Sequence, residues 1–165
     1  MLVDDLFART RLLLGHNGLD RLAAARVAVF GVGGVGGYAV EALARSGVGA
    51  LDLIDSDTVD ATNLNRQIIA TMDAVGRPKT QVAAERVASI NPSCIVRPRQ
   101  CFFLPETADQ FDFATFDYVI DAVDTVSAKI ALVEAAFAAG VPSTHTVFIL
   151  FLFFEQQTST ISFLY

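Results

Sequence analysis

The sequence has 165 residues, about the length of one compact domain, and 53% of them are hydrophobic. This hydrophobic share, with only 18% charged residues, excludes a disordered chain and suits a sheet that is covered on both faces. The formal net charge is -6 and the 12 basic residues are scattered. Such a distribution excludes the basic stripe typical of duplex-binding proteins but leaves room for a local RNA contact.

Predicted strands and helices alternate along the chain. The strands are short apolar runs at 26–30, at 50–54, from 94–96 onward and at 117–121. The helices have apolar or alanine-rich periodic patterns, at 6–14, 18–25, 38–46, 79–90 and 125–139. In the last of them, an apolar stripe is expected to face the core, formed by Val126, Ile130, Val133 and Phe137. Alternation of this kind predicts a Rossmann-like α/β fold, with a mainly parallel sheet and helices on both faces.

Composition divides the chain into three predicted segments. Residues 1–25 form an N-terminal helical segment, 26–142 a Rossmann-like domain and 143–165 an atypical apolar tail. The apolar run 147–154 is far shorter than the roughly 20 residues that span a bilayer, so we expect no membrane association. We interpret this run as a buried final strand, with an aggregation-prone tail as the alternative.

The cysteines, the histidines and the N-terminus bear on chemistry and location. Cys94 and Cys101 form no paired CxxC motif, and we interpret them as packed residues because no basic group is evident to lower a thiol pKa. His16 and His145 are isolated in the sequence, and we assign them no catalytic role. The N-terminus has acidic residues where a signal peptide would have basic ones. We therefore expect a cytoplasmic protein that is not exported.

A glycine-rich loop lies between the first predicted strand and the following helix. Its glycines are Gly31, Gly33, Gly34 and Gly36. In this position the missing side chains let backbone N–H groups and the helix N-terminus approach phosphate oxygens. The loop predicts a nucleotide site and by itself fits NAD as well as ATP. The alternative is a tight strand-to-helix turn that binds no ligand.

Acidic residues follow two of the predicted strands. Asp55 ends the second strand, where a carboxylate can accept hydrogen bonds from ribose hydroxyls, while Asp57 either binds ribose or caps the next turn. Asp121 and Asp124 flank the end of the fourth strand, at the edge where ligands bind in open α/β sheets. We expect Asp124 to hold Mg²⁺ together with phosphate oxygens, with helix capping as the alternative.

A polar segment and two basic residues distinguish this predicted site from that of a typical NAD enzyme. Arg66, within the segment 62–67, offers a planar charged fork, and Lys79 offers a point charge at the start of a helix. Either charge alone is more commonly a solvated surface group. Their shared position near the glycine loop favours a triphosphate over a pyrophosphate, and therefore ATP over NAD.

These motifs together resemble the ThiF-like adenylyltransferases, which are related to ubiquitin-activating enzymes. The resemblance covers about residues 7–142 and is closest to the branch of tRNA threonylcarbamoyladenosine dehydratases. It is carried by an ordered set of motifs: Gly31-Val32-Gly33-Gly34-Val35-Gly36, Asp55-Ser56-Asp57, Asn63-Leu64-Asn65-Arg66-Gln67, Val75-Gly76-Arg77-Pro78-Lys79 and Asp121-Ala122-Val123-Asp124.

The resemblance implies ATP-dependent adenylation of a carboxylate with release of pyrophosphate. In the dehydratase branch, the carboxylate belongs to the threonyl group of a modified tRNA adenosine, and attack by the neighbouring amide oxygen closes a ring. By motif position, the implied residue roles are Gly34 and Asp55 at the nucleoside, Thr62, Asn63 and Arg66 at the ribose and phosphates, Lys79 at the phosphates, Asp124 at magnesium-ATP, and Arg9 reaching across a homodimer.

The resemblance weakens after Pro142. Family members continue there into a glycine-containing segment and a further half that helps to form the substrate site, whereas this sequence turns to an apolar tail. We expect a truncated or frameshifted reading frame. The alternatives to the tRNA dehydratase are adenylation of a ubiquitin-like sulfur carrier, a nucleotide-binding fragment without catalysis, and, last, an NAD-dependent oxidoreductase.

Overall fold

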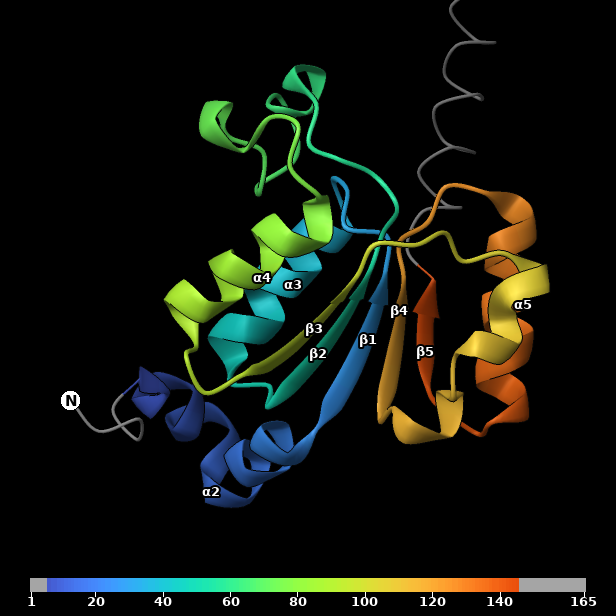
Figure 1. The fold of residues 1–165 in the computed structure, drawn as a ribbon. Helices are drawn as coiled ribbons and strands as arrows, with labels where there is room; N and C mark the ends of the chain where they lie inside the picture. The colour runs from blue at the N-terminus through green and yellow to red at the C-terminus, as the bar shows by residue number, and fades with distance from the viewer. Residues whose placement is uncertain (1–5, 146–165) are drawn as a thin grey trace, which may run out of the picture.

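The computed structural model describes residues 6–145, which form a parallel sheet flanked by helices (Figure 1). The strands are β1 (Arg26–Phe30), β2 (Ala50–Ile54), β3 (Ile95–Arg99), β4 (Tyr118–Asp121) and β5 (Ser143–His145). The α-helices are α2 (Ala8–Ala24), α3 (Gly36–Ser46), α4 (Lys79–Ile90) and α5 (Val126–Ala138). Short 3-10 helices lie in the connections, at Ala61–Asn63, Met72–Ala74, Pro105–Gln110 and Phe113–Thr115. No helix among the described residues is long and apolar enough to cross a membrane.

The strand order is β3-β2-β1-β4-β5, and every neighbouring pair is parallel. Phe30 at the end of β1 stands level with Ile54 of β2 on one side and with Asp121 of β4 on the other. The order reverses between β1 and β4, because the chain goes from β1 outward to β3 and then returns to β4. Parallel sheets bind ligands at the carboxyl ends of the strands beside such a switch point.

Each face of the sheet has its own apolar core. On one face Val29, Leu51 and Leu53 pack with residues of α3 and α4, and on the other Ala28, Phe30 and Ile54 pack with residues of α5 and the connection before β4. Phe30 is at the centre of an aromatic group in the second core, with the ring centroids of Phe103 and Phe111 at 5.0 and 5.4 Å. Strands buried on both faces account for their nearly continuous apolar sequences.

The predicted elements are confirmed with small shifts. The third strand begins at Ile95, and the two N-terminal helical stretches form one helix, α2, that is kinked at Gly15, whose φ is 71°. β5 extends the sheet beyond Pro142, within the segment 143–165 that was predicted to be an apolar tail. The division into three segments stays a prediction. The predicted final strand at 147–154 lies outside the described residues.

The prediction of which side of α5 faces the core is wrong. Its apolar stripe is exposed, at 51% for Val126, 55% for Ile130, 44% for Val133 and 86% for Phe137. The helix instead buries its alanine-rich side, with Ala128, Lys129, Leu132 and Ala136. Small side chains let the helix approach the sheet closely, and Lys129 is held by an ion pair with Asp121, so the most apolar side of the helix is not the one that packs.

Candidate nucleotide-binding site

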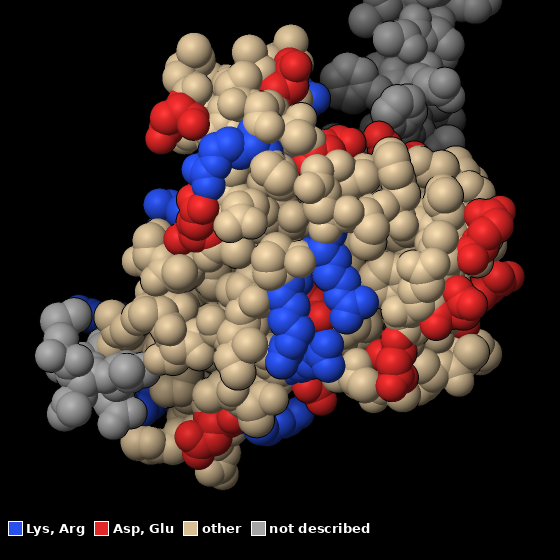
Figure 2. Space-filling model, in the orientation of Figure 1, with Lys and Arg blue, Asp and Glu red and all other residues tan. Residues whose placement is uncertain are grey.

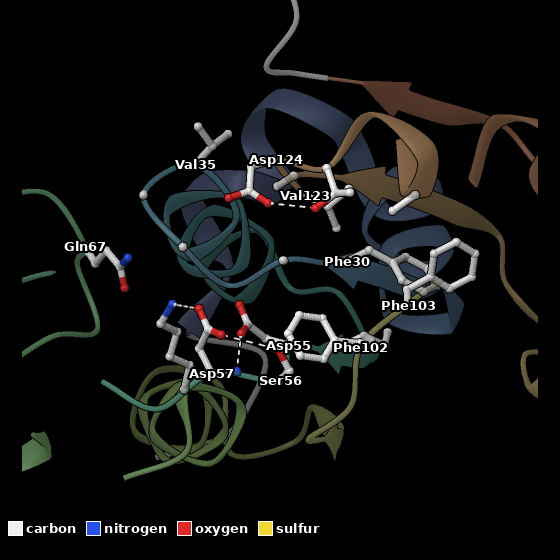
Figure 3. A pocket seen from close by; sticks show the side chains of 18 of the residues that line it. Phe30, Val35, Asp55, Ser56, Asp57, Gln67, Phe102, Phe103, Val123 and Asp124 are labelled. Carbon is white, nitrogen blue, oxygen red and sulfur yellow. Dashed lines mark hydrogen bonds and ion pairs between the residues drawn. The ribbon is translucent and has the colours of Figure 1, made fainter. Parts of the chain in front are cut away.

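A cavity of about 820 Å³ lies at the carboxyl ends of β1, β2 and β4, at the switch point of the sheet. Most of the predicted site residues line it: Gly31, Gly33, Gly34, Asp55, Asn63, Arg66, Lys79 and Asp124. Figure 3 shows Asp55 and Asp57 on one side of the glycine loop, Asp124 on the other, and Gln67 at a third side. The tertiary structure therefore brings together groups from widely separated parts of the sequence.

The four positions of the loop require glycine for different physical reasons. A Cβ on Gly36 would lie 1.8 Å from the carbonyl oxygen of Gly31, and a Cβ on Gly31 would lie 2.6 Å from that of Ala122, so packing excludes side chains at both. A Cβ on Gly33 or Gly34 would meet no described atom closer than 3.8 or 3.7 Å. The fold therefore does not need glycine at Gly33 and Gly34, whereas a phosphate that approaches the backbone does.

Asp55 braces the loop from the end of β2. One carboxylate oxygen accepts the backbone N–H of Val32 at 2.7 Å, and the other accepts that of Asp57 at 2.8 Å. Each oxygen keeps a second lone pair, which is compatible with the predicted hydrogen bonds from ribose hydroxyls. The same side chain can thus hold the loop and face a nucleoside.

Lys79 is placed in the cavity by an ion pair. Its side chain starts α4, is only 7% exposed, and donates from Nζ to Asp57 at 2.7 Å. The following 3-10 helix is capped by Asp60, so the capping alternative for Asp57 is not realised. A buried ammonium group with one carboxylate partner keeps two N–H donors for phosphate oxygens.

The polar segment after β2 is organised by Asp60 and Asn63. The Asn63 side-chain oxygen accepts the backbone N–H of Asp60 at 3.1 Å, which holds the buried Asn63 at the cavity wall. Arg66 donates from Nη1 to the carbonyl oxygen of Thr62 and to Asn65, both at 3.0 Å, and lines the cavity.

Thr62 has a structural partner and is not part of the cavity wall. Its hydroxyl and its backbone N–H both donate to Asp60, at 2.6 and 2.8 Å, and these bonds lower the pKa of Asp60. Thr62 therefore contacts Arg66 through its carbonyl oxygen but, unlike Asn63 and Arg66, does not line the cavity.

Gln67 and Phe102 line the cavity, although the sequence predicted no site role for either residue. Gln67 is 7% exposed, and its side-chain oxygen is buried without a hydrogen-bond partner among the described residues. Buried polar atoms are normally paired, so this atom indicates a missing partner such as a bound ligand or water. Phe102 is 67% exposed and faces the cavity beside Asp55 and Ser56, where a flat apolar ring can stack on a base (Figure 3). Gln67 belongs to the motif Asn63–Gln67, but the motif alone assigns it no role, and no sequence pattern singles out Phe102.

The two acidic residues after β4 have different surroundings. Asp121 is fully buried, and Lys129 donates to both of its carboxylate oxygens at 3.0 Å. Asp124 is exposed at the cavity rim, and its only hydrogen bond with the described residues is a weak one from the Thr125 hydroxyl at 3.3 Å. The helix-capping alternative is not realised, because the cap residue Thr125 makes no side-chain capping bond. Asp124 is thus the acid that is accessible to a ligand.

A bound metal ion would need ligands from the nucleotide as well as from the protein. Among the described residues no three His, Cys, Asp or Glu side chains are grouped as a protein-only metal site. Mg²⁺ commonly takes one or two carboxylates together with substrate phosphates and water, and Asp124 at the rim fits that arrangement.

Arg9 lies far from this cavity within the chain. It belongs to α2, at the end of the sheet opposite the strand arrowheads (Figure 1). The expectation that it acts across a homodimer concerns a second copy and stays a prediction.

His145 has partners that the sequence did not reveal. Its Nδ1 lies 2.9 Å from Asp121, and its Nε2 lies 3.0 Å from the Ser143 hydroxyl. The cysteines behave as predicted: burial raises the pKa of Cys94 to about 11 and also raises that of Cys101, so neither thiol is an activated nucleophile near neutral pH.

The sheet order, the loop and the cavity define a Rossmann-type domain with its ligand site at the switch point. The chain belongs to the ThiF family, whose model matches residues 7–152 and so extends past Pro142. It is 48% identical over 136 residues to the tRNA threonylcarbamoyladenosine dehydratase of Bacillus subtilis, covering 82% of this chain and 54% of that protein. For the Escherichia coli dehydratase the identity is 47%, covering 77% of this chain and 47% of that protein.

Solved structures agree with this family. The E. coli tRNA threonylcarbamoyladenosine dehydratase in complex with ATP has a TM-score of 0.84 and 43% identity, covering 86% of this chain and 58% of that one. The same enzyme is also known in complex with AMP. A more distant relative, the probable adenylyltransferase/sulfurtransferase MoeZ of Mycobacterium tuberculosis, is 38% identical, covering 78% of this chain and 33% of that protein. The chain spans about half the length of the dehydratases that it matches.

Proposed function

We propose that this chain carries the ATP-binding part of an enzyme that adenylates a carboxylate. The observation that carries the proposal is the pair Gly33 and Gly34, which the fold does not require and which border the cavity. Backbone N–H groups left open in this way suit phosphate oxygens. The ATP and AMP complexes of the E. coli dehydratase support the same ligand class for the related cavity here.

The proposed reaction is a displacement at the α-phosphorus of ATP. A substrate carboxylate oxygen forms the new bond to phosphorus, and the bond to the bridging oxygen breaks, so pyrophosphate leaves with the electron pair. Arg66 and Lys79 supply fixed positive charge at the cavity wall, which stabilises the negative charge that develops on the phosphate oxygens. Asp124 would hold Mg²⁺, which supplies further charge neutralisation when bound.

We propose that the carboxylate is the threonyl group of a modified tRNA adenosine. Its adenylate would then lose AMP when the neighbouring amide oxygen attacks the activated carbonyl carbon and closes a ring, so the net change is dehydration. The higher identity to the dehydratases, 47% and 48% against 38% for MoeZ, favours this substrate over a sulfur-carrier protein. A homodimer in which Arg9 reaches the partner's cavity, and a cytoplasmic location, belong to the same proposal.

ATP–pyrophosphate exchange tests the proposal directly. With tRNA bearing the threonylcarbamoyl adenosine, we expect exchange that falls about 100-fold or more in Asp124→Ala, because the rim then lacks its metal-binding carboxylate. Asp109→Ala, an exposed change on the 3-10 helix Pro105–Gln110, is the matched control and should keep full exchange.

Each alternative has its own result in this assay. Unchanged exchange in Asp124→Ala would remove Asp124 from the mechanism. Exchange that requires a small carrier protein in place of tRNA would support the sulfur-carrier alternative, and ATP binding without exchange would support a fragment that has lost catalysis. Binding of NAD without binding of ATP would contradict adenylation of either substrate.

A further inference from the structure

Three arginine side chains surround one buried carboxylate on the sheet face that carries α5. Asp52 of β2 is 0% exposed, and Arg26 of β1 with Arg97 and Arg99 of β3 lie within 4 Å of its oxygens. Figure 2 shows basic side chains gathered on this face with a small acidic area between them. We call Arg26, Arg97 and Arg99 the arginine patch.

Arg26 has a structural role. Its Nε and Nη2 donate to the two oxygens of Asp52 at 2.8 and 2.9 Å, and its guanidinium lies 4.9 Å from the centre of the Phe116 ring. The hydrogen bond to Asp52 raises the pKa of Arg26, and the charge of Asp112 adds to the rise. The single charge of Asp52 is therefore largely balanced by Arg26 alone.

Arg97 and Arg99 contact Asp52 less closely than Arg26 does. Their nearest nitrogens are 3.7 and 3.9 Å from Asp52, beyond hydrogen-bond distance, and neither side chain donates a hydrogen bond to any described residue. The buried Nη1 atom of Arg97 is the nitrogen that faces Asp52, and it has no hydrogen-bond partner among the described residues. The two side chains are still 41% and 40% exposed, so their solvent-facing N–H donors can reach an outside acceptor.

The two arginines are also held in place. Asp52 attracts both guanidinium groups, and that of Arg99 lies 5.4 Å from the centre of the Phe111 ring. Stacking and ion-pair attraction limit the conformations of a long side chain before it binds, which lowers the entropy cost of binding. In a chain of net charge -6, three guanidinium groups around one carboxylate leave two positive charges in excess of it.

The chain leads from the arginine patch directly into the nucleotide cavity. The carbonyl oxygen of Arg99 accepts the backbone N–H of Asp55 at 3.3 Å, and the next residue, Gln100, donates to the carbonyl oxygen of Ser56 at 3.4 Å. Cys101 then lines the cavity itself. At about 3.3 Å per extended residue, Arg97 is roughly 13 Å along the chain from Cys101.

We propose that Arg97 and Arg99, held by Asp52, bind the phosphate backbone of the tRNA whose modified adenosine enters the cavity. The inference rests on the tRNA substrate of the proposed function. The guanidinium fork matches two phosphate oxygens and binds them more specifically than a lysine would. Contacts of this kind position a nucleic acid without recognising its sequence, as an enzyme needs when its specificity lies in one modified base.

The test measures tRNA binding by the Arg97→Gln/Arg99→Gln double variant over a range of salt concentrations. Loss of two phosphate contacts should weaken binding about 10- to 30-fold near physiological salt and make the log–log salt slope less steep by about 1.5. Unmodified tRNA should lose affinity by the same factor, because the contacts are to phosphates. Arg45→Gln, on α3 across the sheet, is the matched control with one arginine neutralised and should bind as the parent chain does.

ATP binding separates this inference from the function on which it rests. The double variant should bind ATP with unchanged affinity, and a parallel loss of ATP binding would mean a structural effect and overturn the inference. Equal tRNA affinity and equal salt slope in the parent and double variant would also overturn it while leaving the tRNA substrate in place. Failure of the parent chain to bind tRNA, with ATP still bound, would remove both the tRNA substrate and the role of the patch.

Discussion

At the scale of single residues, the glycine loop combines two requirements that look alike in the sequence. Gly31 and Gly36 leave room for neighbouring backbone atoms, and Gly31 also has a positive φ of 87°. Gly33 and Gly34 border open space at the cavity. The first pair therefore serves stability and the second pair serves the ligand, a distinction that separate substitutions can test.

Alanine at Gly34 and at Gly36 should have opposite effects. Gly34→Ala should leave the free energy of unfolding unchanged or raise it by up to about 1 kcal/mol, because the site has room and alanine restricts the unfolded chain. Its ATP affinity should fall at least about tenfold, since the methyl group occupies phosphate space. Gly36→Ala should lower the free energy of unfolding by about 2 kcal/mol or more, because its Cβ would overlap the Gly31 carbonyl.

Urea unfolding and ATP titration of the two variants provide the measurements. Gly33→Ala extends the comparison, because it has the same open surroundings as Gly34 and should behave similarly. ATP binding by Gly34→Ala at the affinity of the parent chain would contradict the assignment of this glycine to the ligand.

At the scale of elements, one carboxylate ties two helices together. Glu41 of α3 accepts hydrogen bonds from Arg86 of α4 at 2.8 and 2.9 Å and from Arg45 of its own helix at 2.6 and 2.9 Å. The hydrogen bonds from Arg86 are the largest influence on the pKa of Glu41 and lower it from its usual value of 4.5. The helices α3 and α4 thus share an ionic contact at the border of their common core.

This contact predicts a pH dependence of stability. Because the pKa of Glu41 is lower in the folded chain than in the unfolded one, its contribution is complete above about pH 4.5 and is lost as the pH falls through the folded value. Glu41→Gln should cost about 1–2 kcal/mol of unfolding free energy at pH 7, and that cost should shrink toward pH 3. Chemical denaturation at pH 7, 5 and 3 measures the difference.

Glu134→Gln is the control for that series, because Glu134 is an exposed carboxylate on α5. It should change stability by less than about 0.5 kcal/mol at each pH. A cost for Glu41→Gln that stays constant from pH 7 to pH 3 would show that its charge is not the source of the stabilisation.

Helix α5 shows where pattern analysis fails at this scale. Its strongest apolar stripe predicts a core face, yet Phe137 is exposed and the alanine side packs on the sheet. The helix is apolar nearly all round, so periodicity alone does not select a face. The choice follows from the close packing of Ala128 and Ala136 and from the ion pair between Lys129 and Asp121, which joins the helix to the end of β4.

At the scale of the whole molecule, the cavity depends on three strands meeting at one edge. Groups from the ends of β1, β2 and β4, and from the segment before α4, face the same space. A ligand that contacts all of them connects parts of the chain that separate on unfolding. Binding should therefore stabilise the entire fold and not only the loop.

ATP should raise the melting temperature of this chain. At 100 times the dissociation constant, binding to the folded state alone adds about 2.7 kcal/mol, equivalent to about 5–10 °C for a chain of this size. Thermal unfolding with and without ATP and Mg²⁺ measures the shift, with Gly34→Ala as the variant in which it should be reduced. NAD at the same concentration should leave the melting temperature unchanged, and an equal shift with NAD would revive the oxidoreductase alternative.

Local patterns in the sequence were sufficient for the order of strands and helices, the position of the glycine loop and most of the cavity residues. Apolar periodicity and the residues at strand ends carry this information, because the backbone conformation of short segments depends largely on near neighbours. Parallel strands then bring their carboxyl ends to one edge, which made Asp55 and Asp124 predictable as site residues before their surroundings were known.

Partners distant in the sequence were decided only by the tertiary structure. The pairing of Asp57 with Lys79, the unpaired oxygen of Gln67 and the packed side of α5 depend on which elements lie against each other. The same holds for the arginine patch, since the parallel register of β1, β2 and β3 brings its residues around Asp52. A sequence specifies the chemical groups that are available, but the register of the sheet and the close packing of its helices determine which groups meet.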